Sequence, residues 1–222
     1  CSTTLAADIT VDGHGGGDFK TVQAAIDSIV PKDSEWTRIL IRPGTYTEQL
    51  TIDKPRVRLI GLTDNPADVV LTFNLNALSP QKSGHGTVGT TRSSSTFVKT
   101  NDFAAQNVTF ATSTPPHVAQ AVAIKEVGDR LVFDHYRFVG FQDTLYASGG
   151  RQLYKDCSII GAVDFIFGDA TAVFDHCTIL SVARGHITAA NTEPSTKTGY
   201  VFLNCTLKAD DGVRAGSVDL GR

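Results

Sequence analysis

Several residue types and motifs that define common protein classes are missing from this chain of 222 residues. It contains no methionine, so residue 1 is not an initiator, and we expect either a processed N-terminus or a fragment. No apolar run approaches the roughly 20 residues that a transmembrane helix needs. No signal peptide is recognisable. The sequence therefore predicts no membrane span.

The chain also lacks a strong excess of charge of either sign. Lys and Arg number 20 and Asp and Glu number 23, mixed along the sequence, which gives a net charge of −3. This balance argues against a nucleic-acid partner. A polyanionic substrate stays open, but its attraction would have to come from local Arg and Lys side chains.

Cysteine is scarce, and catalytic motifs built on other residues are absent. The four cysteines are Cys1, Cys157, Cys177 and Cys205, too few for a disulfide scaffold, and no C-x-x-C pair suggests zinc. The motifs G-x-S-x-G and H-E-x-x-H are both missing, which disfavours a serine esterase and a zinc protease. We therefore predict neither a metal nor a cofactor. Cys1-Ser2 is compatible with the acylated start of a bacterial lipoprotein or with an arbitrary first residue, and the sequence leaves this open.

A short repeat runs through the second half of the chain. Five segments share the pattern polar, polar, apolar, polar, apolar, which is typical of a strand with one buried face. They are residues 106–110, 134–138, 155–159, 175–179 and 203–207. Their second residues are Asn107, His135, Asp156, His176 and Asn204, at steps of 28, 21, 20 and 28. We interpret these five as polar turn residues, and we give His135 and His176 no catalytic role.

This period indicates a solenoid. A strand in each short repeat, without a regular intervening helix, favours stacked parallel strands. A β-sandwich would instead show hairpin signals between neighbouring strands, and the only two Asp-Gly pairs, at residues 12–13 and 211–212, do not join repeat strands. The predicted fold is all-β, a right-handed parallel β-helix, as a single domain over residues 1–222.

The N-terminal part differs from the repeats. Val22, Ala25, Ile26 and Ile29 recur with helical spacing after a candidate N-cap, Thr21. This helix is expected to cap the open end of the solenoid, where strand edges would otherwise invite aggregation. Residues 38–41 and 57–62 are predicted strands, and residues 79–95, rich in Ser, Gly and Thr, are predicted to form a long projecting loop.

The repeat spacing also brings polar residues together. Asp143 and Asp164 are 21 residues apart, as are His135 and Asp156, and Gln120 and Gln142 are 22 apart. Residues one period apart stack on adjacent coils at about 4.8 Å. Two carboxyl groups this close cannot both ionise cheaply, so one acts as an acid and the other as an anion. Two neighbouring amides can stabilise an oxyanion.

These same residues carry a family resemblance. The segments GFQDTL at 140–145 and DFIFG at 164–168 resemble the two signature blocks of pectin methylesterases. The segments at 18–26, 44–48 and 120–124 resemble further blocks in the family's order. Leu220-Gly221-Arg222 resembles the start of the last block, which continues Pro-Trp in the family, so the final coils are expected to be missing.

The resemblance implies a role for each matching residue. Asp164 is the expected nucleophile, Asp143 the acid and base, and Gln142 the oxyanion donor, while Arg222 holds Asp164. The expected substrate-binding residues are Gln120, Thr90 and Phe165. For Phe167, a position in the core is favoured.

The resemblance also implies a wider setting. It supports a disulfide between Cys157 and Cys177, with reduced core thiols as the alternative and Cys205 as a free thiol. The implied activity is demethylation of pectin (homogalacturonan) with release of methanol. We expect a secreted or extracellular monomer, at a cell wall or at a bacterial periplasm or outer surface.

Three other functions also fit a β-helix of this kind. A lyase needs clustered carboxylates for calcium and a basic proton acceptor. A polygalacturonase that inverts needs carboxyl groups about 6.5–9.5 Å apart. The third class is a catalytically silent carbohydrate-binding β-helix. Two glutamines beside the carboxylate pair suit an ester oxyanion better than the other chemistries.

Overall fold

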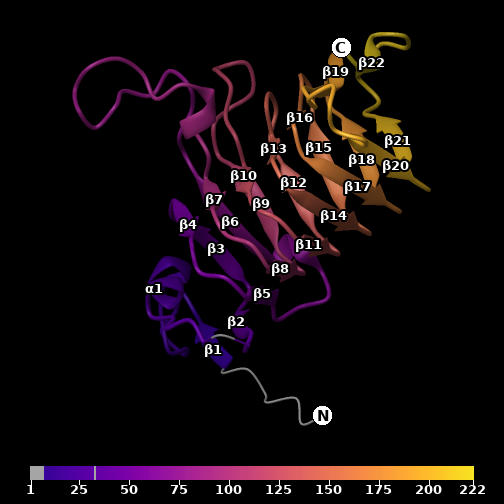
Figure 1. Cartoon of the computed structure of the whole chain (residues 1–222). Helices are drawn as coiled ribbons and strands as arrows, with labels where there is room; N and C mark the ends of the chain where they lie inside the picture. Colours follow the sequence, from indigo (N-terminus) through magenta and orange to yellow (C-terminus); the bar gives the residue numbers. More distant parts are fainter. Residues whose placement is uncertain (1–7, 33) are drawn as a thin grey trace.

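The computed structural model describes residues 8–32 and 34–222, and its strands form a solenoid of three parallel sheets (Figure 1). Each full coil contributes one strand to each sheet, and strands of successive coils pair side by side. The predicted all-β parallel β-helix is therefore confirmed. Cys1 lies outside the described residues.

The three sheets differ only slightly in size. Sheet A has eight strands: β1 (Asp8–Val11), β2 (Thr37–Ile41), β5 (Val57–Gly61), β8 (Phe103–Gln106), β11 (Leu131–Asp134), β14 (Arg151–Lys155), β17 (Thr171–Asp175) and β20 (Tyr200–Leu203). Sheet B has seven: β3 (Gly44–Thr47), β6 (Val69–Phe73), β9 (Thr109–Thr112), β12 (Arg137–Val139), β15 (Ser158–Gly161), β18 (Thr178–Ser181) and β21 (Thr206–Ala209). Sheet C has seven: β4 (Leu50–Ile52), β7 (Thr96–Val98), β10 (Ile124–Val127), β13 (Leu145–Ser148), β16 (Ile166–Gly168), β19 (Gly185–Ala190) and β22 (Val218–Gly221).

The five repeat segments turn out to be corners, not single strands. In each segment the second residue has a positive φ, from 53° at Asn204 to 61° at His135, and it separates a strand of sheet A from one of sheet B. Asn, Asp and His enter this left-handed region more easily than most residues. The backbone N–H of His135 donates to the Lys155 carbonyl of the next coil at 2.9 Å. The predicted turn role holds, but the expectation of one continuous strand is wrong.

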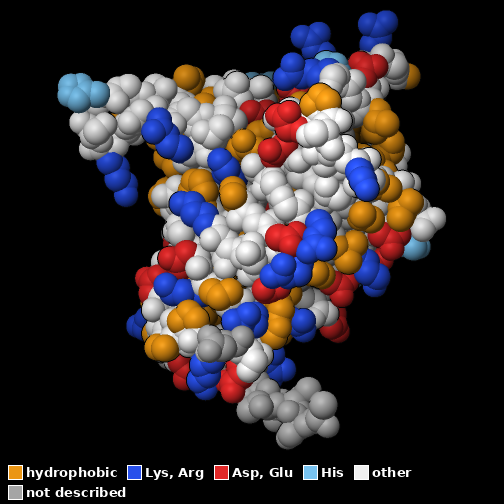
Figure 2. Space-filling view, in the orientation of Figure 1, with side chains coloured by type: hydrophobic (Ala, Val, Ile, Leu, Met, Phe, Trp, Pro, Cys, Tyr) orange, Lys and Arg blue, Asp and Glu red, His pale blue; other side chains and the backbone are white. Residues whose placement is uncertain are grey.

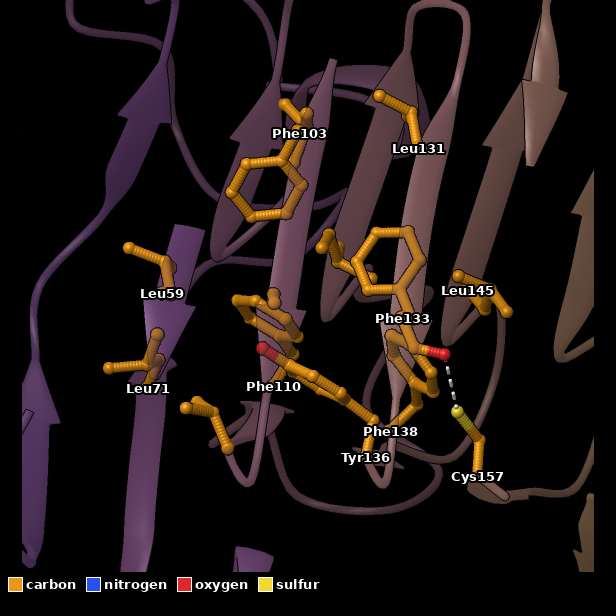
Figure 3. Close-up of a cluster of buried hydrophobic side chains, with 14 of the residues drawn as sticks. Leu59, Leu71, Phe103, Phe110, Leu131, Phe133, Tyr136, Phe138, Leu145 and Cys157 are labelled. Carbon is orange, nitrogen blue, oxygen red and sulfur yellow. Dashed lines mark hydrogen bonds between the residues drawn. The ribbon is translucent and has the colours of Figure 1, made fainter. Parts of the chain in front are cut away.

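The interior is filled by stacked apolar side chains from all three sheets. Phe133 and Tyr154, on neighbouring strands of sheet A, have parallel rings with centroids 5.1 Å apart. Tyr154 and Phe174 continue the stack at 4.5 Å. Figure 3 shows the central part of this core, where Phe103, Phe110 and Phe133 face one another between the sheets. The alternation along each strand places these residues inside and their neighbours outside.

The predicted capping helix is present but short. Helix α1 (Val22–Asp27) begins after Thr21, whose hydroxyl accepts a hydrogen bond from the Ala24 N–H at 3.3 Å. The Glu48 carboxylate accepts hydrogen bonds from the N–H groups of Val22 and Gln23. The helix packs against β1, β2 and β4, the first strands of sheets A and C, so it covers the N-terminal end of the solenoid (Figure 1).

The long loop extends from the coils as predicted (Figure 1). It contains one turn of 3-10 helix, η2 (Thr90–Arg92), and an isolated bridge between Pro80 and Thr87. A second such turn, η1 (Pro66–Asp68), precedes β6. Residues 93–95, at the end of the loop, are fully buried. The loop is therefore anchored to the solenoid at its C-terminal end.

The predicted disulfide between Cys157 and Cys177 is absent from the structure, where both residues are free thiols. Each thiol instead donates to backbone carbonyls, Cys157 to Phe133 at 3.5 Å (Figure 3) and Cys177 to Tyr154 at 3.4 Å. Cys205, one coil further on, is also free, and its thiol donates to the Phe174 carbonyl at 3.2 Å. The alternative of stacked core thiols describes this structure.

The surface carries charges of both signs. Figure 2 shows Lys and Arg side chains interspersed with Asp and Glu over the visible face, with hydrophobic groups between them. Within residues 8–32 and 34–222, no helix is long and apolar enough to cross a membrane.

Candidate active site

The two acidic blocks fold as the same turn on adjacent coils. Each turn leads from sheet B to sheet C, from β12 to β13 and from β15 to β16. A Cβ at Gly140 would lie 2.5 Å from the Thr144 hydroxyl, and one at Gly161 would lie 2.3 Å from the Phe165 Cβ. Both positions therefore need glycine, because in each turn the residue four positions later lies directly against the glycine Cα.

Both aspartates lie at the corner of this turn. Asp143 has φ of 64° and Asp164 has φ of 50°. Asp accepts the left-handed region at lower cost than bulky residues do. Since the repeat corners show the same conformation, this backbone is a property of the solenoid and not by itself a sign of catalysis. Because both aspartates have this backbone conformation, neither side chain follows the in-and-out alternation of the flanking strands.

The strand register places the two aspartates at equivalent positions of neighbouring coils. Leu145 pairs with Ile166, and an isolated parallel bridge joins Gln142 to Val163. The Asp143 N–H donates to the Val163 carbonyl at 3.1 Å. In this register, each residue of one turn faces the residue 21 positions later, which is the spacing of Asp143 and Asp164.

The surroundings of Asp143 favour its protonated form. Burial raises its pKa from 3.8 to about 7, and the charge of the neighbouring Asp164 acts in the same direction. The positive charge of the Arg222 guanidinium opposes this increase and is the smallest of the three effects. A carboxyl group with a pKa near 7 can both donate and accept a proton close to neutral pH.

Asp164 is held by a two-point contact with arginine. Arg222 donates from Nε to Oδ1 at 3.0 Å and from Nη2 to Oδ2 at 2.8 Å, and the side chain of Asp164 is only 12% exposed. Bidentate pairs of this kind fix the orientation of the carboxylate. Strand β22 carries Arg222 to this position, 58 residues along the chain from Asp164. The expected contact between the two residues is therefore present.

The two glutamines line a cleft that does not include the aspartates themselves, although Gln142 and Val163, which each precede one aspartate, belong to its walls. The cleft has a volume of about 510 Å³, and its walls include Gln120, Gln142, Phe141, Val163, His117 and Arg184. Sheet C aligns Ile124 with Leu145, a step of 21, so Gln142 is level with Ala121 and not with Gln120. Gln120 therefore lies one residue out of the expected register, but it reaches the same cleft.

The three predicted substrate-binding residues have different surroundings. Gln120 lines the cleft, and its backbone carbonyl accepts a hydrogen bond from the Ala77 N–H. The carbonyl of Ala77 accepts a hydrogen bond from the N–H of Gly89, the residue before Thr90. Thr90 is half-buried at the start of η2. Phe165 is 0% exposed and packs in the core. It is unable to contact a substrate, because the left-handed backbone at Asp164 turns the next side chain inward.

Phe167, assigned to the core at the sequence level, lies on the outside of sheet C. It is half-buried and stacks on Tyr146 of the neighbouring coil, with centroids 4.3 Å apart and planes at 22°. The alternation of β16 explains this exchange, since Ile166 points inward and Phe167 outward. Tyr146 and Phe167 each follow one of the aspartates by three residues.

The sequence did not point to two histidines near the site, His186 beside Asp164 and His117 on the wall of the cleft. His186 Nδ1 lies 3.7 Å from Asp164 Oδ1, and its carbonyl accepts the Asp164 N–H at 2.8 Å. Sheet C aligns Ile166 with Thr188, a step of 22, so applying that step to Asp164 would have pointed to His186. His117 contacts Phe141 edge to face at 4.5 Å, and no repeat marks it in the sequence.

Metal ligands are not gathered at this site. Over the part of the chain that the structure describes, no three His, Cys, Asp or Glu side chains lie close enough together to hold a metal ion.

The fold and the site together define a parallel β-helix protein with a coupled pair of carboxyl groups, next in sequence to two residues, Gln142 and Val163, that line a cleft. Comparison with known proteins identifies the family within this class. The family model described as Pectinesterase matches residues 8–220. The chain belongs to the pectinesterase family, whose members are ester hydrolases.

Relatives and solved structures agree with this assignment. The chain is 39% identical to Pectinesterase 31 of Arabidopsis thaliana over 218 residues, which cover 96% of this chain and 68% of that protein. It is 34% identical to a pectinesterase of Petunia integrifolia, covering 90% of this chain and 54% of that protein. The chain thus spans about half to two thirds of the length of these relatives.

Among solved structures, the pectin methylesterase PemA from Erwinia chrysanthemi superposes with a TM-score of 0.88 at 34% identity, over 100% of this chain and 71% of that one. A crystal structure of a pectin methylesterase in complex with a hexasaccharide superposes with a TM-score of 0.89 at 34% identity, with the same coverage. Pectin methylesterase from carrot gives a TM-score of 0.84 at 27% identity, over 95% of this chain and 66% of that one.

Proposed function

We propose that this protein removes methyl groups from methyl-esterified homogalacturonan and releases methanol. The observation that carries the proposal is the unequal pair of carboxyl groups. The pKa of Asp143 is raised to about 7, while Asp164 is held by two hydrogen bonds from Arg222. A protonated acid next to an anion is the arrangement that ester cleavage through a covalent intermediate needs.

In the first half of the reaction, the Asp164 carboxylate attacks the C6 carbonyl carbon of a methyl ester. The carbonyl π electrons move to oxygen, and the amide of Gln142, supported by that of Gln120, donates hydrogen bonds to the resulting oxyanion. As the tetrahedral intermediate collapses, the C–O bond to the methoxy group breaks. Asp143 gives its proton to that oxygen, so methanol leaves and an acyl-enzyme anhydride remains.

In the second half, Asp143 is a carboxylate and takes a proton from water. The resulting hydroxide attacks the acyl carbon, the bond to Asp164 breaks, and a galacturonate carboxyl group is released. Asp164 returns to the anion and Asp143 to the acid, so the cycle closes without a cofactor. The matching blocks at 140–145 and 164–168 support these roles, because each places its aspartate at the same corner of adjacent coils.

The substrate follows from the family and from the walls of the site. Gln120, Thr90 and the half-buried Tyr146–Phe167 pair are proposed to bind the polysaccharide, and Phe165 is not. We also propose that the protein acts as a monomer in a single domain, outside the cell, at a cell wall or at a bacterial periplasm or outer surface, because its substrate is a cell-wall polymer.

The test is methanol measured from highly methylated pectin, comparing the wild-type chain with Asp143→Asn and Lys208→Gln, the latter an exposed control. We expect release by the wild type and the control, and loss by Asp143→Asn. Chain cleavage without methanol would instead indicate a polygalacturonase, and an unsaturated product would indicate a lyase. Saccharide binding with no turnover would indicate a silent carbohydrate-binding protein.

A further inference from the structure

A histidine on the coil after Asp164 lies against the proposed nucleophile. His186 belongs to β19 of sheet C, and its backbone carbonyl accepts the N–H of Asp164 at 2.8 Å. Its ring Nδ1 lies 3.7 Å from Asp164 Oδ1. His186 therefore meets Asp164 through both its backbone and its side chain, and the reaction steps described above give it no role.

The other ring nitrogen of His186 faces a second carboxylate. Strand β22 pairs with β19 in a register that aligns Asp219 with His186. His186 Nε2 lies 3.9 Å from Asp219 Oδ2. The imidazole thus stands between the Asp164 side chain, which is 12% exposed, and that of Asp219, which is 75% exposed. Because water screens the exposed carboxylate, Asp219 mainly orients the ring, and the charge of the ring acts on Asp164.

The protonation state of the ring decides which of these contacts it can make. A neutral imidazole carries one N–H, whereas the imidazolium cation carries two. Only the cation can donate to the carboxylates on both sides at once. Histidine is the side chain whose charge ordinarily changes between about pH 5 and pH 8. The position of His186 therefore favours a second donor on Asp164 when the ring is charged.

A charged His186 takes up part of the carboxylate that the reaction needs. A carboxylate offers about four lone-pair sites, two on each oxygen. Arg222 already occupies one site on each, from Nε to Oδ1 and from Nη2 to Oδ2. A proton donor at Nδ1 of His186 would use the second site on Oδ1. A single site, on Oδ2, is then left to attack the ester carbonyl.

The same charge also acts on Asp143. The negative charge of Asp164 is the second cause, after burial, that raises the Asp143 pKa to about 7, and the charge of Arg222 opposes it. A further positive charge beside Asp164 offsets more of its negative charge, so Asp143 holds its proton less tightly. The groups that face His186 are thus Asp164 from the turn between β15 and β16, with Asp143 behind it, and Asp219 and Arg222 from β22 and the residue after it.

We propose that His186 is a positioning residue that lowers the activity of the site in acid, because its charged ring holds Asp164 and partly neutralises it. This inference rests on the proposed function and adds a control of that function by pH. Above the pH range in which histidine titrates, the ring leaves Oδ1 free of a second cation, and Asp164 is available as the nucleophile. Below that range, Asp164 is held by two cations, and both members of the carboxyl pair are weakened.

The first test follows kcat/KM for methanol release from a fully methylated oligogalacturonide, whose own charge does not change with pH. This parameter reports the ionisable groups of the free enzyme. From about pH 7 to pH 5 we expect kcat/KM of the wild type to fall roughly fivefold to tenfold. The neutral variants His186→Gln and His186→Asn should lose this decrease, and His186→Lys, which is charged throughout, should stay low at both pH values.

The control is His176→Gln. His176 also contacts an aspartate, with its Nδ1 at 2.8 Å from Asp175 Oδ1, but it lies at a corner between sheets A and B. His176→Gln should keep the pH profile of the wild type. A purely structural role of His186 would lower kcat/KM in its neutral variants by the same factor at every pH and would leave the acid decrease in place.

The second test does not depend on turnover. The ¹³C shift of the Asp164 carboxyl carbon is followed with pH in Asp143→Asn, where the neighbouring carboxyl group no longer titrates. We expect an inflection between about pH 5 and pH 8 that disappears when His186→Gln is added and remains when His176→Gln is added.

The two tests separate this inference from the proposed function. No inflection, an inflection that survives His186→Gln, or an equal acid decrease of kcat/KM in wild type and His186→Gln would overturn the inference while leaving the proposed activity intact. Absence of methanol release together with a His186-dependent inflection would overturn the proposed function instead, and the control of Asp164 by His186 would stand.

Discussion

The electrostatic coupling between the two aspartates can be tested by removing one charge. At pH 7 a carboxyl group with a pKa of about 7 is half protonated, as Asp143 is in this structure. At its ordinary pKa of 3.8, only about one molecule in a thousand would be protonated at that pH. The surroundings of Asp143 thus increase the fraction of the acid several hundredfold.

Replacing Asp164 by asparagine removes the negative neighbour with little change in shape. Two causes raise the Asp143 pKa, burial first and the Asp164 charge second, and only the second is lost. The pKa of Asp143 is therefore expected to fall in Asp164→Asn but to stay above 3.8. Arg222, released from its partner, strengthens the decrease.

The assay is ¹³C NMR titration of the Asp143 carboxyl carbon in wild type and in Asp164→Asn, with Asp219→Asn as a control for an exposed acid outside the pair. The reasoning predicts a midpoint near 7 in the wild type, a lower midpoint in Asp164→Asn, and an unchanged midpoint in Asp219→Asn. A wild-type midpoint near 4, or one that does not move when Asp164 is replaced, would refute the coupling.

Three further predictions follow from other contacts. Phe165→Ala should lower the free energy of unfolding by about 3–5 kcal/mol because it empties a fully buried site. The matched Phe167→Ala should lower the free energy of unfolding far less and instead raise KM. Urea unfolding and methanol release separate the two effects, and equal destabilisation would contradict the assignment. Arg222→Gln should lower kcat roughly 10- to 100-fold, with partial recovery in Arg222→Lys, since the two hydrogen bonds to Asp164 are lost; unchanged kcat in Arg222→Gln would show that Arg222 is dispensable. Burial raises the pKa of Glu126, which accepts a hydrogen bond from Tyr154, so its contribution to stability is complete below the ordinary pKa of 4.5 and declines as pH rises above it. In urea unfolding, Glu126→Gln should remove this decline, and wild-type and variant curves that stay parallel as pH rises would argue against a buried neutral acid.

The architecture could be predicted because the solenoid repeats its pattern. Alternating polar and apolar residues, one short period and few hairpin signals excluded a sandwich, and the same period aligned Asp143 with Asp164. The capping helix followed from the N-cap Thr21, which is exposed, and from the spacing of Val22, Ala25 and Ile26, which the structure buries. These features depend on local sequence, which is why they could be inferred without coordinates.

The details that failed depend on backbone conformation and packing. The left-handed corners at Asn107 and His135 break each repeat into two strands, and alternation alone does not show such a break. After the same conformation at Asp164, Phe165 is buried where contact with substrate was expected, and Phe167 lies on the outer face where burial was expected. A step of 21 residues in sheet C, instead of 22, moved Gln120 out of line with Gln142.

Other parts of the site depend on the exact step between coils, which varies along the solenoid. The contact of His186 with Asp164 needs a step of 22 residues in sheet C, one more than the step of 21 that aligns the two aspartates. Whether the Cys157 and Cys177 thiols are free or bonded likewise depends on local geometry, which the equal repeat position of the two residues does not fix.

The most direct test of the whole account is a double-mutant cycle on methanol release with Asp143→Asn, Asp164→Asn and the double variant. Residues that act as one catalytic unit give strongly non-additive losses. If stacked coils bring the two carboxyl groups into one site, the double variant should be no slower than the slower single variant. Losses in kcat that simply multiply would show that the two aspartates work independently, and would contradict the shared site.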